Sequence, residues 1–396
     1  LPRGTMKIKD VEVAIWTLTN LGGASLGDCV ATVASSCIRG VISAAPGNVL
    51  YCADFANIEG RKQAWLSGED WKINAFIEYD TVIGTSANGE KLRAGPDLYK
   101  LAFSNSFGVS VDSVTSDQRQ VGKTQELALG FGGGVSALSE MAKTYGVDLE
   151  ELPAMVLPRA TPEQRERAEW SANKFMEGKK EKGLDPGMGI YAAEACDVLK
   201  QMWRENHPAI VAYWKECHAA AVYAIVCQKP KRARHVVMDM WCGFLRVTLP
   251  SGRCIYMYDP QVTIGDVVVR DASDQYAHTL YEGLMNPEPG KRPKCEITFW
   301  GVDSMTSRWM KKHTWGGDIF QSIVQGSARD IMAGAGLKVD SKGYPVILTV
   351  HDELISEVPK GYGSLEEYER LMSLVPGWAS GLPIAVEGWT GERYRK

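Results

Sequence analysis

The chain has 396 residues, 45% of them hydrophobic and 23% charged, which is enough apolar material for a large core in two or three domains and excludes broad disorder. There is no run of 18 or more apolar residues for a membrane span, and the N-terminal LPRGT has no signal-peptide pattern. Nine scattered cysteines without a C-x-x-C pair predict reduced thiols and a cytoplasmic location, and the net charge of −4 shows no general basic excess.

The first half of the chain reads as one buried strand followed by helices. Turn-forming, capping and charge patterns predict a strand over 47–53, a helix capped by Ser116 and continuing to about Phe131, a charged helix over 161–182, and helical sequence over 191–226 with a break near Pro208. Basic residues cluster at 229–234 and again at 308–312. Such clusters are more often solvated turns than phosphate contacts.

The second half changes to a β pattern. Residues 236–300 read as strands, with a hairpin formed by 244–249 and 254–258, and a helix is predicted over 318–337. Two short strands, 346–350 and 354–358, enclose a tight turn. If strand 47–53 pairs with these late strands in one sheet, the helical material between them forms a separate lobe, so the predicted fold class is α+β.

Three carboxylates stand at strand ends. Asp54 follows the first buried strand, and Asp352 and Glu353 occupy the turn between the late strands. Carboxylates in such rigid positions suit Mg²⁺, and a pair of such ions can stabilise both oxygens of a phosphoryl transfer. Taken singly, each residue is better explained as an ordinary turn acid.

Four side chains recur every four residues on the predicted helix: Arg119, Lys123, Leu127 and Phe131. This spacing places them along one stripe, with cations first and apolar groups last. Such a stripe can bind a triphosphate at one end and a base or sugar at the other. An amphipathic helix with surface cations would show the same pattern.

Ordered motifs give a specific resemblance. Segment 54–61, DFANIEGR, resembles motif A of the A-family DNA polymerases of bacteria and phages, D-[YF]-S-x-I-E-x-R. Segment 119–132 resembles motif B, R-x-x-x-K-x-x-x-[FY]-x-x-x-Y-G, and segment 350–353, VHDE, resembles motif C. Segment 324–330, VQGSARD, is similar to the family's M-Q-G-T-A-A-D helix, and 1–4, LPRG, is similar to a phage thumb–palm junction.

The resemblance implies a right-hand polymerase with an antiparallel palm sheet and helical fingers. Its boundaries would be a first palm part at 1–100, fingers and following helices at 101–235, and a second palm part at 236–396. It implies two Mg²⁺ ions, with Mn²⁺ as a substitute, held by Asp54, Asp352 and the backbone carbonyl of Phe55, with Glu353 assisting nearby.

The resemblance also implies substrate contacts. Arg119 and Lys123 would hold the β and γ phosphates of a dNTP, and Leu127, Phe131 and Glu59 would lie at its sugar and base. Primer–template DNA would meet side chains from three motif regions, namely Gln325, Gln321, His351 and Arg61. For Arg61 a structural ion pair is the open alternative.

Departures from the family pattern bear on sugar selection and fidelity. Leu127 stands where the family has Phe or Tyr, Phe131 where it has Tyr, and Gly317 where many members have Arg. The N-terminal residues leave no room for a thumb or exonuclease, so we expect either a truncation at the thumb–palm junction, which 1–4 favours, or a separate subunit.

Two other functions stay open. A single-subunit RNA polymerase has the same arrangement of catalytic residues in its palm domain. Against it, Glu59 resembles the bulky residue that excludes ribose and so selects deoxyribose. A catalytically inactive DNA-binding subunit would not need Asp54, Asp352 and Lys123. A phage replication enzyme in a bacterial cytoplasm, with no membrane partner, is the favoured interpretation.

Overall fold

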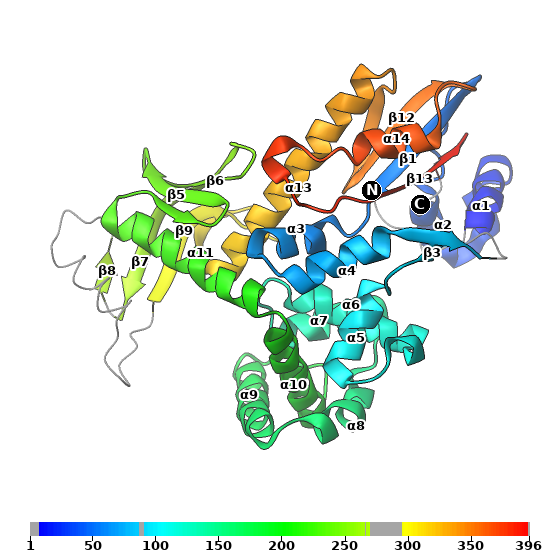
Figure 1. The fold of residues 1–396 in the computed structure, drawn as a ribbon. Coiled ribbons are helices and arrows are strands. Elements are labelled where there is room, and N and C mark those ends of the chain that lie inside the picture. The colour runs from blue at the N-terminus through cyan, green and yellow to red at the C-terminus, as the bar shows by residue number, and fades with distance from the viewer. Residues whose placement is uncertain (1–7, 87–90, 266, 270–294, 395–396) are drawn as a thin grey trace. The chain divides into compact units, whose positions relative to one another are not determined.

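A computed structural model describes residues 8–86, 91–265, 267–269 and 295–394, so segment 1–4 of the family resemblance lies outside the described residues. The chain divides into two compact units (Figure 1). Unit 1 comprises 1–58, 328–380 and 384–396, and unit 2 comprises 59–327 and 381–383. Both combine helices with antiparallel sheets, which confirms the predicted α+β class.

Unit 1 is built on a four-stranded antiparallel sheet in the order β11-β12-β1-β13. Its strands are β1 (Asn48–Phe55), β11 (Val346–Val350), β12 (Glu353–Pro359) and β13 (Val386–Gly391). β1 and β12 pair from Asn48 opposite Pro359 to Asp54 opposite Glu353, so the predicted pairing of the early strand with the late ones is confirmed. Leu50, Cys52 and Ile355 are fully buried on one face of this sheet, and Tyr51 and Ala53 are buried on the other, so the centre of β1 is covered on both faces.

The remaining elements of unit 1 are helical. They are α1 (Ile8–Asn20), α2 (Val30–Cys37), α14 (Leu365–Met372), the second half of α13 (Gly316–Ser341), and the 3₁₀ turns Gly23–Cys29 and Gly377–Ala379. Ser364 caps α14 by accepting a hydrogen bond from the amide of Glu367 at 3.1 Å.

Unit 2 begins with a helical part. Its helices are α3 (Ile58–Ser67), α4 (Asp70–Asp80), α5 (Leu98–Phe107), α6 (Ser116–Leu129), α7 (Val135–Tyr145), α8 (Leu152–Val156), α9 (Pro162–Glu181), α10 (Ile190–Asn206) and α11 (Pro208–Cys227), with a small hairpin of β2 (Val82–Thr85) and β3 (Lys91–Arg93) and short 3₁₀ turns at 111–113, 149–151 and 157–159. α5 and α6 pack closely because Gly122 has no Cβ, which would lie 2.1 Å from the carbonyl oxygen of Tyr99.

A second antiparallel sheet completes unit 2, with strands in the order β10-β9-β7-β6-β5-β4 and β8 paired to β7. The strands are β4 (Lys231–Ala233), β5 (Val236–Trp241), β6 (Phe244–Thr248), β7 (Cys254–Ile264), β8 (Val267–Val269), β9 (Cys295–Val302) and β10 (Trp309–Thr314). One face carries the buried side chains of Val236, Met238, Leu245 and Val247, and α11 runs along this sheet in Figure 1.

Helix ends differ from the sequence-based expectation by small amounts. The cap of α6 is Thr115 rather than Ser116, because Thr115 and Gln118 form a reciprocal capping box. The helix ends at Leu129, so Phe131 lies in the following turn. The compact units divide the chain at other positions than the expected 100 and 235. In the described part of the chain, no helix combines the length and apolar character needed to cross a membrane.

Candidate active site

Strand pairing in unit 1 brings the motif A and motif C carboxylates to one end of the sheet. Asp54 lies opposite Glu353, and the amide of Phe55 donates to the carbonyl oxygen of Asp352 at 3.2 Å. Asp54 and Asp352 are both partly exposed. Two residues, His351 and Asp352, form the turn of the β11–β12 hairpin, since Val350 pairs directly with Glu353.

The hairpin turn has a strained backbone. His351 has a φ of +54°, in the left-handed region that non-glycine residues rarely adopt. Such conformations cost about 1–3 kcal/mol and cluster at functional sites. The His351 side chain is exposed, next to the partly exposed Asp352.

Glu353 has a different environment from its neighbour. It is buried, and its carboxylate accepts a hydrogen bond from the hydroxyl of Tyr394. Burial, followed by this carboxylate, raises the pKa of Tyr394, so the phenol stays protonated and keeps donating. Glu353 therefore braces the sheet end behind the two aspartates.

The donor set suits Mg²⁺ in its chemistry. Within the described residues there is no cluster of three or more His, Cys, Asp or Glu side chains that could hold a metal. Mg²⁺ characteristically uses one or two carboxylates and leaves its other positions to water and substrate phosphates. Asp54, Asp352 and a backbone carbonyl would match that requirement for hard oxygen ligands.

In unit 2, α6 presents the predicted stripe. Arg119, Lys123 and Leu127 are partly exposed, whereas Val121, Gln125 and other residues of the opposite face are buried. Leu127 is therefore not a core residue of the helix. Phe131, in the turn after the helix, packs edge-on against Phe320 with ring centroids 5.9 Å apart.

The two cations of the stripe are held by α5 and its cap. Arg119 donates from Nε and Nη2 to the two carboxylate oxygens of Asp97, both at 2.9 Å. The same Asp97 caps α5, accepting from the amides of Tyr99 and Lys100 at 3.0 and 3.1 Å. This side-on pairing fixes the guanidinium plane and leaves the edge formed by Nη1 and Nη2 to bind an anion.

Lys123 lies near two aromatic rings. Its Nζ is 4.3 Å from the ring centroid of Tyr145 and 6.0 Å from that of Tyr99. Burial, followed by Glu126 and Asp97, raises the pKa of Tyr99 to about 12, so this phenol carries no charge at neutral pH. The cationic end of the stripe thus lies beside two tyrosine rings, Tyr99 of α5 and Tyr145 of α7.

Residues from motif A and from α13 meet in unit 2. The amide nitrogen of Gln325 donates to Oε1 of Glu59 at 3.4 Å. Burial raises the pKa of Glu59, and the hydrogen bond from Gln325 partly offsets this. Gln321 lies one turn earlier on α13 and is partly exposed. Sequence reasoning gave these residues separate roles, and the structure places Glu59 and Gln325 side by side.

For Arg61 the structure favours the ion pair over the DNA contact. The side chain is buried, donates to both oxygens of Asp80 at 2.5 and 2.8 Å, and lies over the ring of Phe76. A buried, fully paired guanidinium joins α3 to α4.

The absence of a side chain at Gly317 has a packing cause. A Cβ there would lie 2.3 Å from the ring of Trp315 and 2.4 Å from the carbonyl oxygen of Phe131. The start of α13 therefore packs directly on the turn that carries Phe131, and an arginine at this position would not fit.

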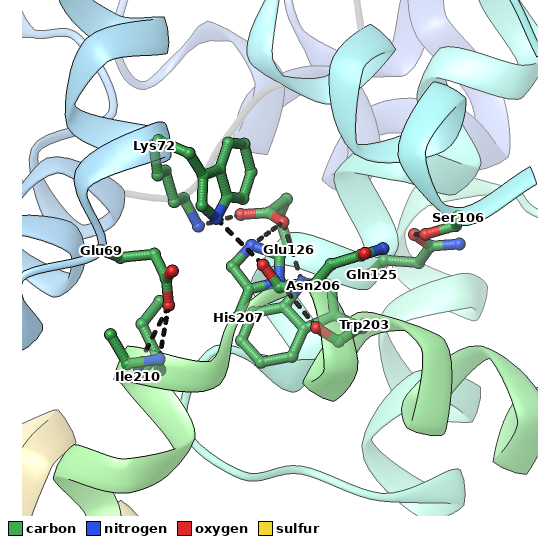
Figure 2. A network of polar contacts seen from close by, with 11 residues as sticks. Glu69, Lys72, Ser106, Gln125, Glu126, Trp203, Asn206, His207 and Ile210 are labelled. Carbon is green, nitrogen blue, oxygen red and sulfur yellow. Dashed lines mark hydrogen bonds and ion pairs between the residues drawn. The ribbon is translucent and has the colours of Figure 1, made fainter. Parts of the chain in front are cut away.

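Sequence reasoning missed a buried polar network behind the stripe (Figure 2). Glu126, on the inner face of α6, pairs with Lys72, accepts from the indole of Trp203 at 2.8 Å, and lies 3.3 Å from Nε2 of His207. Burial alone would raise the pKa of Glu126, but Lys72 and His207 outweigh it and lower that pKa well below its ordinary value. The partners come from α4, α10 and the start of α11, so no local sequence pattern could reveal them.

Comparison with known proteins finds a sequence match to a phage DNA polymerase. The chain is 29% identical to the DNA polymerase of Bacillus phage SP02 over 368 residues, which is 92% of this chain and 44% of that polymerase. A solved structure titled "POL domain of Pol1 from M. smegmatis complex with DNA primer-template and dNTP" matches with a TM-score of 0.48 and 18% identity, over 91% of this chain and 43% of that one. No family model matches.

The chain thus spans less than half the length of the phage polymerase that it matches. Within that span the three motifs occur in order and lie on β1, α6 and the β11–β12 hairpin. The resemblance to a DNA polymerase predicted from the motifs is confirmed by the sequence match across 92% of the chain.

Proposed function

We propose that this chain is the palm and fingers part of a template-directed DNA polymerase that extends a primer 3′ end with dNTPs in phage replication. The observation that carries the proposal is the Asp54–Asp352 pair at the end of one sheet in a chain with three ordered motifs. Unit 1, with this pair, supports assignment as palm, and the helical part of unit 2 as fingers.

In the proposed reaction the primer 3′ hydroxyl attacks the α-phosphorus of the dNTP and pyrophosphate leaves. Asp54 and Asp352, with the carbonyl of Phe55, would hold two Mg²⁺ ions, which supply charge neutralisation when bound. Arg119 and Lys123 would bind the β and γ phosphates, so they stabilise the leaving group. No side chain needs to act as a nucleophile.

Selectivity and DNA positioning would come from other residues. Glu59, held by Gln325, would exclude a ribose 2′ hydroxyl, because a partly buried carboxylate occupies the space that the hydroxyl needs. Gln325, Gln321 and His351 would contact primer–template DNA, and Leu127 and Phe131 the nucleotide. A bacterial host cytoplasm as the place of action belongs to the same proposal.

Primer extension tests the proposal. The chain, with and without any upstream polypeptide, is incubated with primer–template, Mg²⁺ and either dNTPs or rNTPs. We expect template-directed addition of dNTPs and little use of rNTPs. Preferred rNTP addition would indicate an RNA polymerase, and DNA binding without addition under every condition would indicate an inactive subunit.

A further inference from the structure

The unit 2 sheet carries a row of aromatic side chains across its strands. Trp241 pairs with Phe244, Phe244 with Tyr258, Tyr258 with Trp300, and Trp300 with Lys311. Directly paired residues point to the same face of a sheet, so four aromatic residues and a lysine cross five strands on one face.

Further rings extend this row. Tyr256 lies beside it with its ring centroid 5.8 Å from Trp241 and 5.9 Å from Phe244, and Trp309 lies 6.1 Å from Tyr258. Trp241, Phe244, Tyr256, Tyr258, Trp300 and Trp309 are called the aromatic face below.

The aromatic face is open to solvent. Trp241 and Tyr256 are each 47% exposed, Tyr258 44% and Trp309 57%. The core of this sheet lies on its other face, where Met238, Leu245 and Val247 are buried. Exposed apolar patches of this extent mark binding surfaces, because solvated rings contribute little to the stability of the fold.

Charge on and around the aromatic face is positive. The basic clusters noted in the sequence lie on or beside the two edge strands, β4 and β10. Arg232 pairs with Val237 and so points to the aromatic face at one edge, and Lys311 points there at the other. Two carboxylates share this face by strand alternation: Asp239, which is paired with Arg246 through bonds of 2.9 and 2.6 Å, and Glu296, on the strand of Trp300.

The two cations that point to the aromatic face, Arg232 and Lys311, form no ion pair with a carboxylate of the described residues. Such cations are available to phosphates.

We propose that the aromatic face binds single-stranded nucleic acid, with bases stacked on the rings and phosphates drawn to the basic edges. Rings flanked by unpaired cations are the combination that binds single strands without sequence preference. A duplex hides its base faces, and an acidic protein would leave the ring faces without stacking partners. In a template-directed enzyme the single strand bound here would be the unpaired template. This inference rests on the proposed function and adds a binding site that takes no part in nucleotide addition.

The test measures binding without nucleotides, so it does not depend on catalysis. Fluorescence anisotropy compares a labelled 20-nucleotide oligo-dT with a duplex of equal length, on wild type and on Trp241→Ala and Tyr258→Ala. We expect each substitution to weaken oligo-dT binding about tenfold and to change duplex binding little. Tyr258→Phe keeps the ring and should bind like wild type.

Trp170→Ala is the matched control, since Trp170 is 67% exposed on α9, away from this sheet. It should leave binding unchanged, and thermal melting checks that every variant folds. Unchanged oligo-dT affinity in both alanine variants would overturn the proposal. An equal loss of duplex binding would overturn the single-strand assignment. Binding of a folded protein that is abolished by the same alanine substitutions, with oligo-dT affinity unchanged, would identify a protein interface instead.

Primer extension separates this inference from the proposed function. If wild type extends primers but the alanine variants bind oligo-dT normally, only the inference fails. If wild type binds oligo-dT through the aromatic face but extends no primer, only the proposed function fails.

Discussion

Asp97 should control nucleotide affinity through Arg119. Asp97→Asn keeps an oxygen that can cap α5, because Asn caps helices as well as Asp does. It removes the charge and one of the two acceptors that hold the guanidinium. The substitution therefore loosens Arg119 without removing it and without unfolding α5.

The size of the effect follows from the geometry. Charge-assisted hydrogen bonds contribute about 1.5–3 kcal/mol when well formed. Arg119 and Asp97 have side chains that are 36% and 21% exposed, so solvent screening reduces this contribution. We expect a net loss of about 1 kcal/mol in binding the triphosphate, which corresponds to roughly a fivefold higher KM for dNTP.

Steady-state single-nucleotide incorporation measures the KM for dNTP. Asp148→Asn is the matched control, because Asp148 also caps a helical turn but forms no ion pair with an arginine of the described chain. In the background of Arg119→Ala, Asp97→Asn should have no further effect on KM. The reasoning is refuted if Asp97→Asn leaves KM unchanged while Arg119→Ala raises it, or if the two effects simply add.

Three further predictions concern single residues. Lys72→Met should destabilise the protein by about 3–5 kcal/mol in urea unfolding, because it leaves the Glu126 carboxylate buried without its main partner. Since the pKa of Glu126 is lowered in the folded state, the stability that this carboxylate contributes in wild type should be present above its ordinary pKa of 4.5 and should fall as the pH drops below that value. A variant as stable as wild type at pH 7 would contradict the pairing. Glu59→Ala should raise the rNTP-to-dNTP incorporation ratio, and an unchanged ratio would remove Glu59 from sugar selection. Leu127→Tyr should relax discrimination against dideoxynucleotides by about 0.5–1.5 kcal/mol in kcat/KM, because the added hydroxyl can replace the missing 3′ hydroxyl; a uniform drop for all nucleotides would instead indicate overpacking.

Local patterns predicted the elements well where turn and capping signals were strong. The break between α10 and α11 and the β6–β7 hairpin follow from residues close in sequence. The β1–β12 pairing joins segments far apart in the chain, and it was predicted because two separate strand patterns needed partners in one sheet. Helical period also predicted that Arg119, Lys123 and Leu127 share one face of α6, whereas Phe131 lies beyond the end of the helix.

Side-chain contacts between helices could not be predicted. Three sets of contacts depend on how helices α3, α4, α5, α6 and α10 pack. They are the pairing of Arg119 with Asp97, the burial of Arg61 against Asp80, and the network around Glu126. In the same way, the basic clusters looked like solvated turns until strand register placed them at the edges of the aromatic face.

The central claim is that Asp54 and Asp352 carry nucleotidyl transfer directed by a template. Primer extension with Mg²⁺, on four templates that differ in the first unpaired base, tests it most directly in wild type, Asp54→Ala, Asp352→Ala and the exposed-carboxylate control Asp340→Ala. We predict that wild type and Asp340→Ala add the complementary nucleotide on each template. Both active-site variants should bind the same DNA with similar affinity but add nothing. Near-wild-type extension by either variant, or addition that ignores the template base, would contradict the claim.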